Sequence, residues 1–295
     1  MDFSQNEIGS FLVNDIYAID PNAPENLKDL KLMSELFGFS HGRFVAEYPA
    51  DWIYFLQNRL KEMGPLDQSR ASILLNKFLK NTLPIEGGYL RSKDWLSNAL
   101  EFQSKEHKFK NIVTTENSKN IPSLSKILYE EELPDARGEH IKPDIKSYRH
   151  AVAPLFLVSS EIHIQDMYFT LEEDGKKLYR QWDVLRMLIE QAKYSKRCKV
   201  LMFHLGQEKF PTAHLESRLE ETFIQVLEEL GADNLEVSYT LENKKVTHGR
   251  YIFSIKGGLQ FDHGFDTDLK NQDKRNHVHW LSQNELAPLL QRYGI

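Results

Sequence analysis

The sequence predicts an α/β protein in two parts: a helical domain over residues 1–140, then a domain over residues 141–295 with a mixed sheet flanked by helices. Three observations predict it. Helical spacing dominates the first part, a stretch without apolar periodicity follows, and short strand-like runs then alternate with amphipathic helices. A chain of 295 residues is long enough for two hydrophobic cores, so the length agrees with this division.

The first part is expected to hold four helical stretches, at residues 51–64, 67–83, 92–107 and 123–133. Their apolar residues recur near helical spacing, and proline or paired glycines end the first two. Core packing is the ordinary role of such apolar stripes. A partner-binding helix face is the alternative, so protein partners are expected to bind through this helical part.

The domain boundary is expected within residues 133–144, LPDARGEHIKPD. Three turn-forming residues, Pro134, Gly138 and Pro143, lie there among charges. No apolar period runs through the stretch, which is typical of a linker.

Strands and helices alternate in the second part. They are expected at 161–169 (strand), 176–194 (helix), 199–205 (strand), 213–230 (helix), 235–241 (strand), 246–266 (two short strands) and 282–294 (helix). Gly231 is suited to a C-cap, and Ser282 with Glu285 forms a capping box. The segment ENKK, 242–245, suggests a hairpin between the strands on either side of it. Ligands in such mixed sheets gather at strand ends and adjoining loops.

Composition sets the broad class. A net charge of -6, with 41% hydrophobic and 27% charged residues, is ordinary for a soluble globular protein and gives no overall basic field for DNA or anionic lipid. The single cysteine, Cys198, excludes an internal disulfide framework. No secretory signal is recognisable and the longest apolar run, 151–158, is too short to span a bilayer, so a cytoplasmic location is expected. No nucleotide-binding motif occurs, and no cofactor is expected.

The segment 246–266, VTHGRYIFSIKGGLQFDHGFD, carries the residues best suited to chemistry. In an extended strand His248 and Arg250 point to one face, and Tyr251 and Phe253 point to the other. Arginine offers a planar fork of donors to a phosphate, and histidine can donate a proton or attack phosphorus. The alternative is a pair of polar residues on the solvated face of a half-buried strand.

From about residue 145 the chain resembles the phospholipase D superfamily, most closely the degenerate phospholipase-D-like domain at the C-terminus of MIT-domain proteins. The matching elements are Asp166-Met167-Tyr168, His248-Gly249-Arg250, Gly257-Gly258 and Gly264-Phe265-Asp266. The resemblance implies a phosphate-binding groove formed by Asp166, Tyr168, His248, Arg250, His263 and Asp266. It also implies anionic-lipid or protein partners and frequent dimerisation.

The pattern departs from that of active phospholipase D enzymes, H-x-K-x4-D followed by Gly-Ser and Asn. Arg250 replaces the lysine and Ile255 replaces the aspartate, so a nucleophilic His248 lacks its usual support. A second HGR tripeptide begins at His41, but only 40 residues precede it, too few for a duplicated strand-helix unit, and coincidence is favoured. A catalytic pair formed across a homodimer is the alternative.

Two further groups of residues have more than one interpretation. His277 and His279 are spaced to share a strand face and, with His263 and Asp266, suggest a metal site; without an HExxH motif or a carboxylate cluster, surface histidines are favoured and no metal is predicted. The basic cluster consists of Lys193, Lys196, Arg197 and Lys199. Complementing a helix dipole explains this cluster, and contact with nucleic acid or lipid headgroups is the alternative.

Three functions follow from these observations. The first is a non-catalytic phosphate-recognition and protein-interaction module, acting as a subunit of a larger complex; bacterial phospholipase-D-like proteins occur in antiviral defence and mobile-element systems. The second is a metal-independent phosphodiesterase or nuclease, a homodimer that uses His248 and Arg250 as its catalytic residues. The third is a purely structural subunit.

Overall fold

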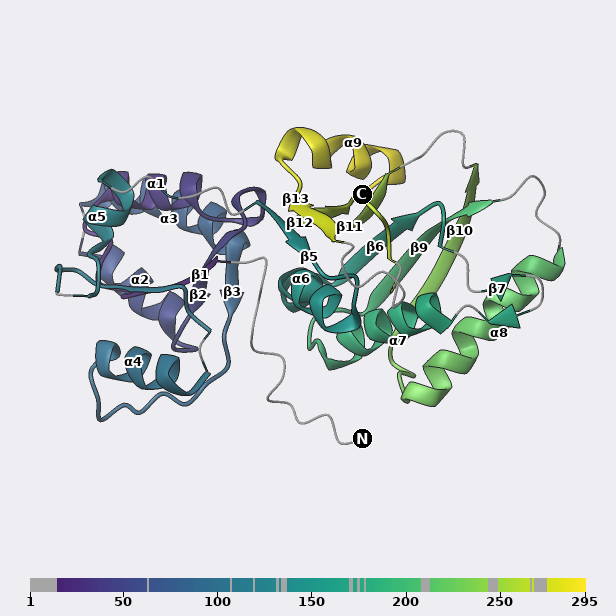
Figure 1. The fold of residues 1–295 in the computed structure, drawn as a ribbon. Helices are drawn as coiled ribbons and strands as arrows, with labels where there is room; N and C mark the ends of the chain where they lie inside the picture. Colours follow the sequence, from purple (N-terminus) through teal and green to yellow (C-terminus); the bar gives the residue numbers. More distant parts are fainter. Residues whose placement is uncertain are drawn as a thin grey trace. The chain divides into compact units, whose positions relative to one another are not determined.

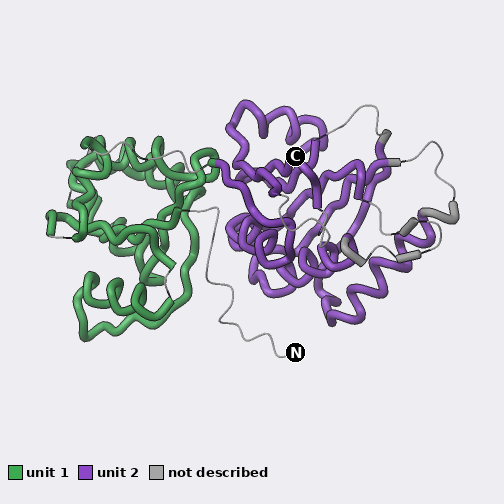
Figure 2. Tube along the Cα trace, viewed as in Figure 1, with its two compact units in different colours: residues 1–137 green, residues 138–295 purple. Residues whose placement is uncertain are grey.

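The computed structural model describes residues 15–62, 64–106, 108–118, 120–130, 133, 137–169, 172–173, 176–177, 179–207, 213–243, 249–265, 267 and 275–295. The chain divides into two compact units, residues 1–137 and 138–295 (Figure 2). The expected boundary after residue 140 lies close to this division. Each unit contains both helices and strands, so the mixed α/β class is confirmed.

The first unit is built on a parallel four-stranded sheet in the order β3-β2-β1-β4 (Figure 1). Its strands are β1 (Asp15–Ile19), β2 (Arg43–Glu47), β3 (Thr82–Pro84) and β4 (Asn111–Val113). Its α-helices are α1 (Leu27–Leu36), α2 (Trp52–Leu60), α3 (Pro65–Phe78), α4 (Trp95–Glu106) and α5 (Leu124–Tyr129), and its short 3-10 helices are η2 (Phe39–His41) and η3 (Leu79–Asn81).

The expectation of a helical N-terminal domain is therefore wrong. The four expected helices are present as α2 to α5, but α1 and all four strands were missed. These strands are three to five residues long and almost entirely buried. Parallel strands covered on both faces do not alternate polar with apolar residues, so the sequence carries no period-two signal for them.

Two polar contacts fasten the helices of this unit. The buried Trp52 donates its indole N–H to the carbonyl of Ile19 at 2.6 Å, which ties α2 to the end of β1. On α4 the side chain of Asn98 accepts from the N–H of Leu90 at 2.8 Å and donates to the Leu90 carbonyl at 3.0 Å. The same amide donates to the carbonyls of Lys93 and Asp94, so one buried side chain closes the loop before α4.

The second unit is built on a seven-stranded sheet in the order β10-β9-β6-β11-β12-β13-β5. Its strands are β5 (Gly138–Ile141), β6 (Glu161–Asp166), β9 (Val200–Gln207), β10 (Glu236–Asn243), β11 (Arg250–Ser254), β12 (Gly257–Phe261) and β13 (Asn276–Trp280). A separate two-stranded ladder joins β7 (Glu172–Glu173) to β8 (Lys176–Lys177). The strands β6, β9 and β10 are parallel to one another, and the rest of the sheet is antiparallel.

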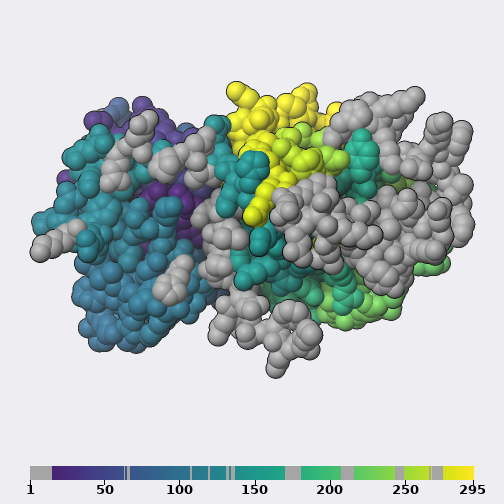
Figure 3. All heavy atoms as spheres, viewed as in Figure 1, coloured from purple at the N-terminus to yellow at the C-terminus, as the bar shows by residue number. Residues whose placement is uncertain are grey.

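Helices cover both faces of this sheet. Figure 1 shows α6 (Ile145–Val158), α7 (Tyr179–Tyr194) and α8 (Ala213–Leu230) on one side and α9 (Gln283–Tyr293) on the other. The C-terminal segment that includes α9 reaches the molecular surface, as the yellow atoms in Figure 3 show. The expected capping box is present, since the backbone N–H of Ser282 donates to the Glu285 carboxylate at 2.8 Å. Among the described residues, no helix combines the length and apolar character needed to cross a bilayer.

The expected hairpin across residues 242–245 is wrong. Strand β10 lies at the edge beside β9, whereas β11 lies between β6 and β12. The ends that this connection joins are three strand positions apart, about 14 Å at the usual strand spacing, which residues 244–249 can span. The central position of Arg250 is nevertheless confirmed, because β11 is the fourth of the seven strands.

Candidate functional site

Arg250 opens β11 at the middle of the sheet, directly opposite Asp166, the last residue of β6. Its Nη1 donates to the carbonyl of Asp262 at 2.7 Å, and its Nε lies 3.7 Å from Asp166 Oδ1. The guanidinium carbon lies 4.8 Å from the centre of the Tyr168 ring, within the range of a cation–π contact. Two segments distant in sequence, residues 166–168 and Asp262, therefore hold one guanidinium, and 24% of the arginine side chain is exposed.

Asp166 is the buried anchor of this arrangement, with only 3% of the residue exposed. Its Oδ1 accepts the backbone N–H of Tyr168 at 2.9 Å, and its Oδ2 accepts the backbone N–H of Phe265 at 3.2 Å. One carboxylate thus fixes the turn after β6 and the turn after β12, besides facing Arg250. Charge-assisted hydrogen bonds of this kind offset the cost of burying an anion.

The Gly264-Phe265 turn packs tightly against the same pair. Gly264 has φ 75°, and a Cβ atom placed there would lie 2.7 Å from Cδ of Arg250 and 2.8 Å from Oδ2 of Asp166. Both the left-handed backbone and the lack of space therefore require glycine at this position. Phe265 is buried against Phe261 with ring centres 4.5 Å apart, which seats the turn on the core.

Asn276 is a structural member of this site that the sequence did not single out. It is 1% exposed; its amide nitrogen donates to the carbonyl of Gly264 at 2.9 Å and its oxygen accepts the N–H of His263 at 3.0 Å. A second bond at 3.2 Å links the amide to the hydroxyl of Tyr148 on α6. Its signal in the sequence is an asparagine in the same alternating register as the apolar Val278 and Trp280.

The residues expected to line the groove have different outcomes. Asp166, Tyr168 and Arg250 lie together. His263 is exposed in the turn after β12, where its backbone is held by Asn276. The expected nucleophile His248 and the groove residue Asp266 lie outside the described residues.

The basic cluster of Lys193, Lys196, Arg197 and Lys199 lies at the opposite end of the sheet from Arg250. Val200 is paired with Glu161 at the start of β6, whereas Arg250 is paired with Asp166 at its end. These positions are separated by about 17 Å of strand, so the cluster does not extend the Arg250 site. Lys193, near the end of α7, donates instead to the carbonyl of Leu230, the last residue of α8, so it contacts the C-terminus of a helix other than its own.

The second HGR tripeptide has a different setting. His41 ends the 3-10 helix η2, Gly42 adopts φ 63°, and the buried Arg43 opens β2 of the first unit. Nε of Arg43 donates to the carbonyl of Leu36 at 3.0 Å. This arginine begins a parallel strand and holds a helix end, whereas Arg250 begins an antiparallel one, so the repeat is not a repeated structural unit.

A chain of hydrogen-bonding side chains crosses the face of the sheet beneath α9. The Nδ1 of His163 lies 3.0 Å from the Nε2 of His204, and the Nδ1 of His204 lies 2.8 Å from the Thr240 hydroxyl. His163 Nε2 lies 3.0 Å from Oε1 of Glu161, without the alignment of a regular hydrogen bond. The Tyr293 ring of α9 covers His204, with ring centres 3.7 Å apart.

These distances fit two neutral imidazoles. A consistent assignment has the Thr240 hydroxyl donating to His204, His204 Nε2–H donating to His163, and His163 facing Glu161. Burial, with a smaller effect of the neighbouring His163, lowers the pKa of His204 to about 3. Burial also lowers the pKa of His163, against the opposing effect of Glu161. Because each ring nitrogen lies near a polar partner, neither histidine is placed to attack a substrate.

A cavity of about 80 Å³ adjoins this chain where it ends. It is lined by residues that include Glu161, His163, Lys256 and Ile295. Water needs roughly 10–15 Å³ of such volume, so the cavity suits a few ordered water molecules beside Glu161. This position is at the start of β6, away from Arg250 at the other end of that strand.

His277 and His279 are brought together with Asp262 rather than with His263. The three offer ligand atoms that all lie within 4.8 Å of one another. Both histidines are partly exposed, whereas Trp280 beside them is 1% exposed. The sequence did not identify Asp262, because its nearness to His277 depends on how β12 pairs with β13.

Comparisons with known proteins identify no family for this chain. No protein-family model matches the sequence, and no curated protein matches it. Among solved structures, the chain is similar to that of TrmBL2, an archaeal chromatin protein with a novel mode of DNA binding, at 15% identity and a TM-score of 0.27. That alignment covers 84% of this chain and 80% of the other. A similarity of this size has no bearing on the function.

Proposed function

We propose that the second unit is a non-catalytic anion-recognition module, related in fold to the degenerate phospholipase-D-like domains, which binds a phosphate group at Arg250. The observation that carries this proposal is the way Arg250 is held. A buried carboxylate and a backbone carbonyl fix it from behind, and the ring of Tyr168, an exposed residue, stacks on it. A guanidinium oriented in advance loses little entropy when it binds a phosphate.

The chemistry of arginine supports this role. Its guanidinium has five N–H donors in a rigid fork. Nη1 donates to the Asp262 carbonyl, whereas the buried Nε faces the Asp166 carboxylate at 3.7 Å, beyond hydrogen-bond distance. Asp166 balances the charge of Arg250 but is buried, so an anion approaching from solvent meets the arginine and the tyrosine first. Tyr168, which is 47% exposed, also offers a flat surface for a base or other planar group.

Recognition is favoured over turnover because the described part of the site offers no histidine pair to attack phosphorus and protonate a leaving group. The buried pair His163 and His204 belongs to a neutral chain beneath α9. A subunit role in a larger complex, dimerisation and partner binding by the first unit remain predictions of the phospholipase D resemblance and the helical pattern.

Binding of a fluorescent single-stranded DNA oligonucleotide and of phosphatidylserine vesicles tests the proposal, since both present phosphate from different sources. Arg250→Lys keeps the charge but loses the fork and the stacking, and we expect it to weaken binding of the responding probe about 10-fold. Arg186→Gln is the matched control, because it removes a surface arginine of the same unit that is paired with Glu229. We expect that control to bind within about two-fold of the wild type.

Two results would contradict recognition at Arg250. Equal weakening by Arg250→Lys and Arg186→Gln would show that the loss is not specific to the Arg250 site, and the absence of binding to both probes would favour a structural subunit. The same DNA is incubated in EDTA with wild type and His248→Ala. If the wild type cleaves the DNA and His248→Ala does not, the protein is a phosphodiesterase and the recognition proposal is wrong.

A further inference from the structure

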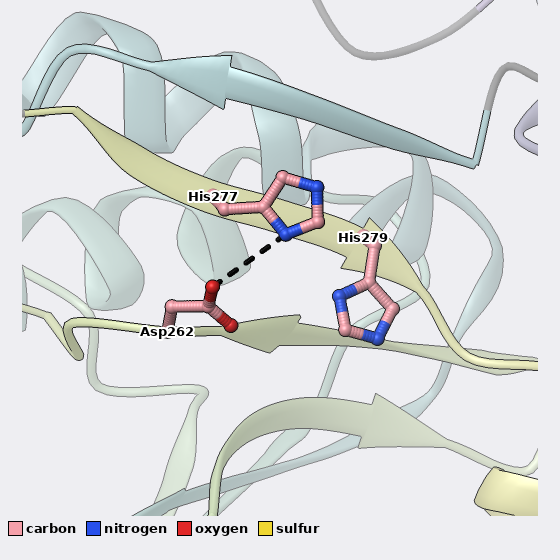
Figure 4. Close-up of side chains that lie close together, drawn as sticks. All are labelled: Asp262, His277 and His279. Atoms are coloured by element: carbon pink, nitrogen blue, oxygen red, sulfur yellow. Dashed lines mark ion pairs between the residues drawn. The ribbon is translucent and has the colours of Figure 1, made fainter.

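Three side chains of the second unit converge on one face of the sheet near its β5 edge. His277 and His279 alternate along β13, so both side chains lie on the same face. Asp262 follows β12 and is the cross-strand neighbour of His277, since its N–H donates to the His277 carbonyl at 3.1 Å. Figure 4 shows the carboxylate and both imidazole rings on the same side of these strands.

The separations suit a small divalent cation. Zinc–nitrogen and zinc–oxygen bonds of about 2.0–2.2 Å in a tetrahedron place neighbouring ligand atoms about 3.3–3.6 Å apart. Oδ2 of Asp262 already lies 3.6 Å from Nδ1 of His277 (Figure 4), and the ligand atoms of all three residues lie within 4.8 Å of one another. On metal binding, the His279 ligand atom would have to move closer to the other two.

The neighbouring edge strand leaves room at this cluster. Gly138 of β5 faces His279 in the strand register, and a Cβ atom there would lie 3.0 Å from Nε2 of His277 and 3.3 Å from Cβ of His279. A larger residue would therefore crowd the His277 ring and the Cβ of His279. His140, the next residue of β5 on this face, lies beside His277, with ring centres 4.8 Å apart and the ring planes tilted by 49°.

The cluster is accessible from solvent. The side chains of Asp262 and His277 are 46% and 36% exposed, so an ion can reach them without any rearrangement of the sheet. Two neutral imidazoles and one carboxylate form a donor set that zinc and neighbouring first-row metals bind well, and three protein ligands leave a coordination position open.

We propose that Asp262, His277 and His279 form a binding site for a zinc-type divalent cation, with three protein ligands and one position open to water or to an anionic oxygen. The site lies on the face of the sheet that α9 partly covers, and the Arg250 side chain lies on the other face. The metal site is independent of the proposed anion recognition by Arg250.

Titration of the full chain with Zn²⁺ by isothermal calorimetry, and with Co²⁺ by visible absorption, tests the site. We expect one Zn²⁺ to bind per chain at this site, and Co²⁺ to give the absorption bands of a four- or five-coordinate complex. Asp262→Asn, His277→Ala and His279→Ala should each weaken Zn²⁺ binding at least 10-fold, because each removes one of three ligands.

His263→Ala is the matched control, since it removes the exposed histidine next to Asp262 that is not among the three. We expect it to bind Zn²⁺ within about two-fold of the wild type, and far-UV circular dichroism to show that each variant is folded. The proposal is overturned if neither metal binds the wild type, or if folded His277→Ala and His279→Ala bind Zn²⁺ as tightly as the wild type does. Equal losses in His263→Ala and the three ligand variants would also overturn it.

Discussion

Acidification should weaken the second unit through the buried pair of His163 and His204. Both imidazoles are held neutral beneath α9, and burial lowers the pKa of each, to about 3 for His204. In the unfolded chain a histidine titrates near pH 6.5, so between that value and about pH 3 the unfolded chain binds more protons than the folded one. The free energy of unfolding therefore falls as the pH falls through this window. The stability that the neutral histidines contribute is fully present above about pH 7.

The magnitude follows from proton linkage. We consider a histidine that stays neutral in the folded protein and has a pKa of about 6.5 in the unfolded chain. Between pH 7 and pH 5 such a histidine lowers the free energy of unfolding by about 2 kcal/mol. His204 is 3% exposed, so solvent screening reduces this figure little. His163 acts in the same direction, but Glu161 at 3.0 Å opposes it, so we expect a smaller contribution from that ring.

Hydrogen exchange measured by mass spectrometry is the suitable assay, because peptides from β6 and β9 report on the second unit within the full chain. After correction for the intrinsic effect of pH on exchange, the protection free energy of these peptides should fall by about 2–4 kcal/mol from pH 7 to pH 5.

His204→Phe separates titration from packing. Phenylalanine keeps the ring stacked on Tyr293 but cannot bind a proton and leaves His163 without its Nδ1 partner. We expect the variant to be less stable at pH 7 and to lose about 2 kcal/mol of the pH dependence. A flat profile for the wild type, or an undiminished pH dependence in His204→Phe, would refute the reasoning.

Two further predictions concern local structure. Gly264→Ala should destabilise the second unit by about 2–4 kcal/mol, measured by the same exchange experiment, because it combines a φ of 75° with overlaps onto Arg250 and Asp166. Gly88→Ala, which meets no atom within 4 Å, is its control, and similar losses in both would contradict the geometry. Asn98→Ala should cost the first unit about 2–4 kcal/mol in urea unfolding, because the buried amide closes the loop before α4. Asn58→Ala, at a partly exposed helical site, should change stability by less than about 0.5 kcal/mol, and equal effects would count against this role.

Much of the second unit was predictable because its helices and strands have regular patterns. The apolar stripes of α7 and α8 and the capping box of α9 are local patterns that can be recognised from neighbouring residues in the sequence. The short strands of the first unit have no such pattern, because both their faces are buried. Helix α6 was also missed, since Pro154 interrupts its apolar run yet lies within the helix.

The candidate site, too, was predictable only where its residues belong to local sequence patterns. Asp166, Tyr168 and Arg250 were grouped by resemblance to known strand motifs, and the structure brings them together. The grouping of Asp262 with His277 depends on strand register, which the sequence does not state directly. The pairing of His163 with His204 was not predicted, because the sequence around a histidine in an apolar strand does not show which residue of another strand it contacts.

The edge strand β5 changes where the protein can be divided. The stretch with the composition of a linker supplies Gly138–Ile141 to the second sheet, where it pairs with β13. A fragment that begins at residue 141 would discard this strand and leave the backbone of β13 open to pairing with other chains, a common cause of aggregation. A fragment that begins a few residues before Gly138 would keep β13 covered, so the chain is better divided at the N-terminal end of the apparent linker than in its middle.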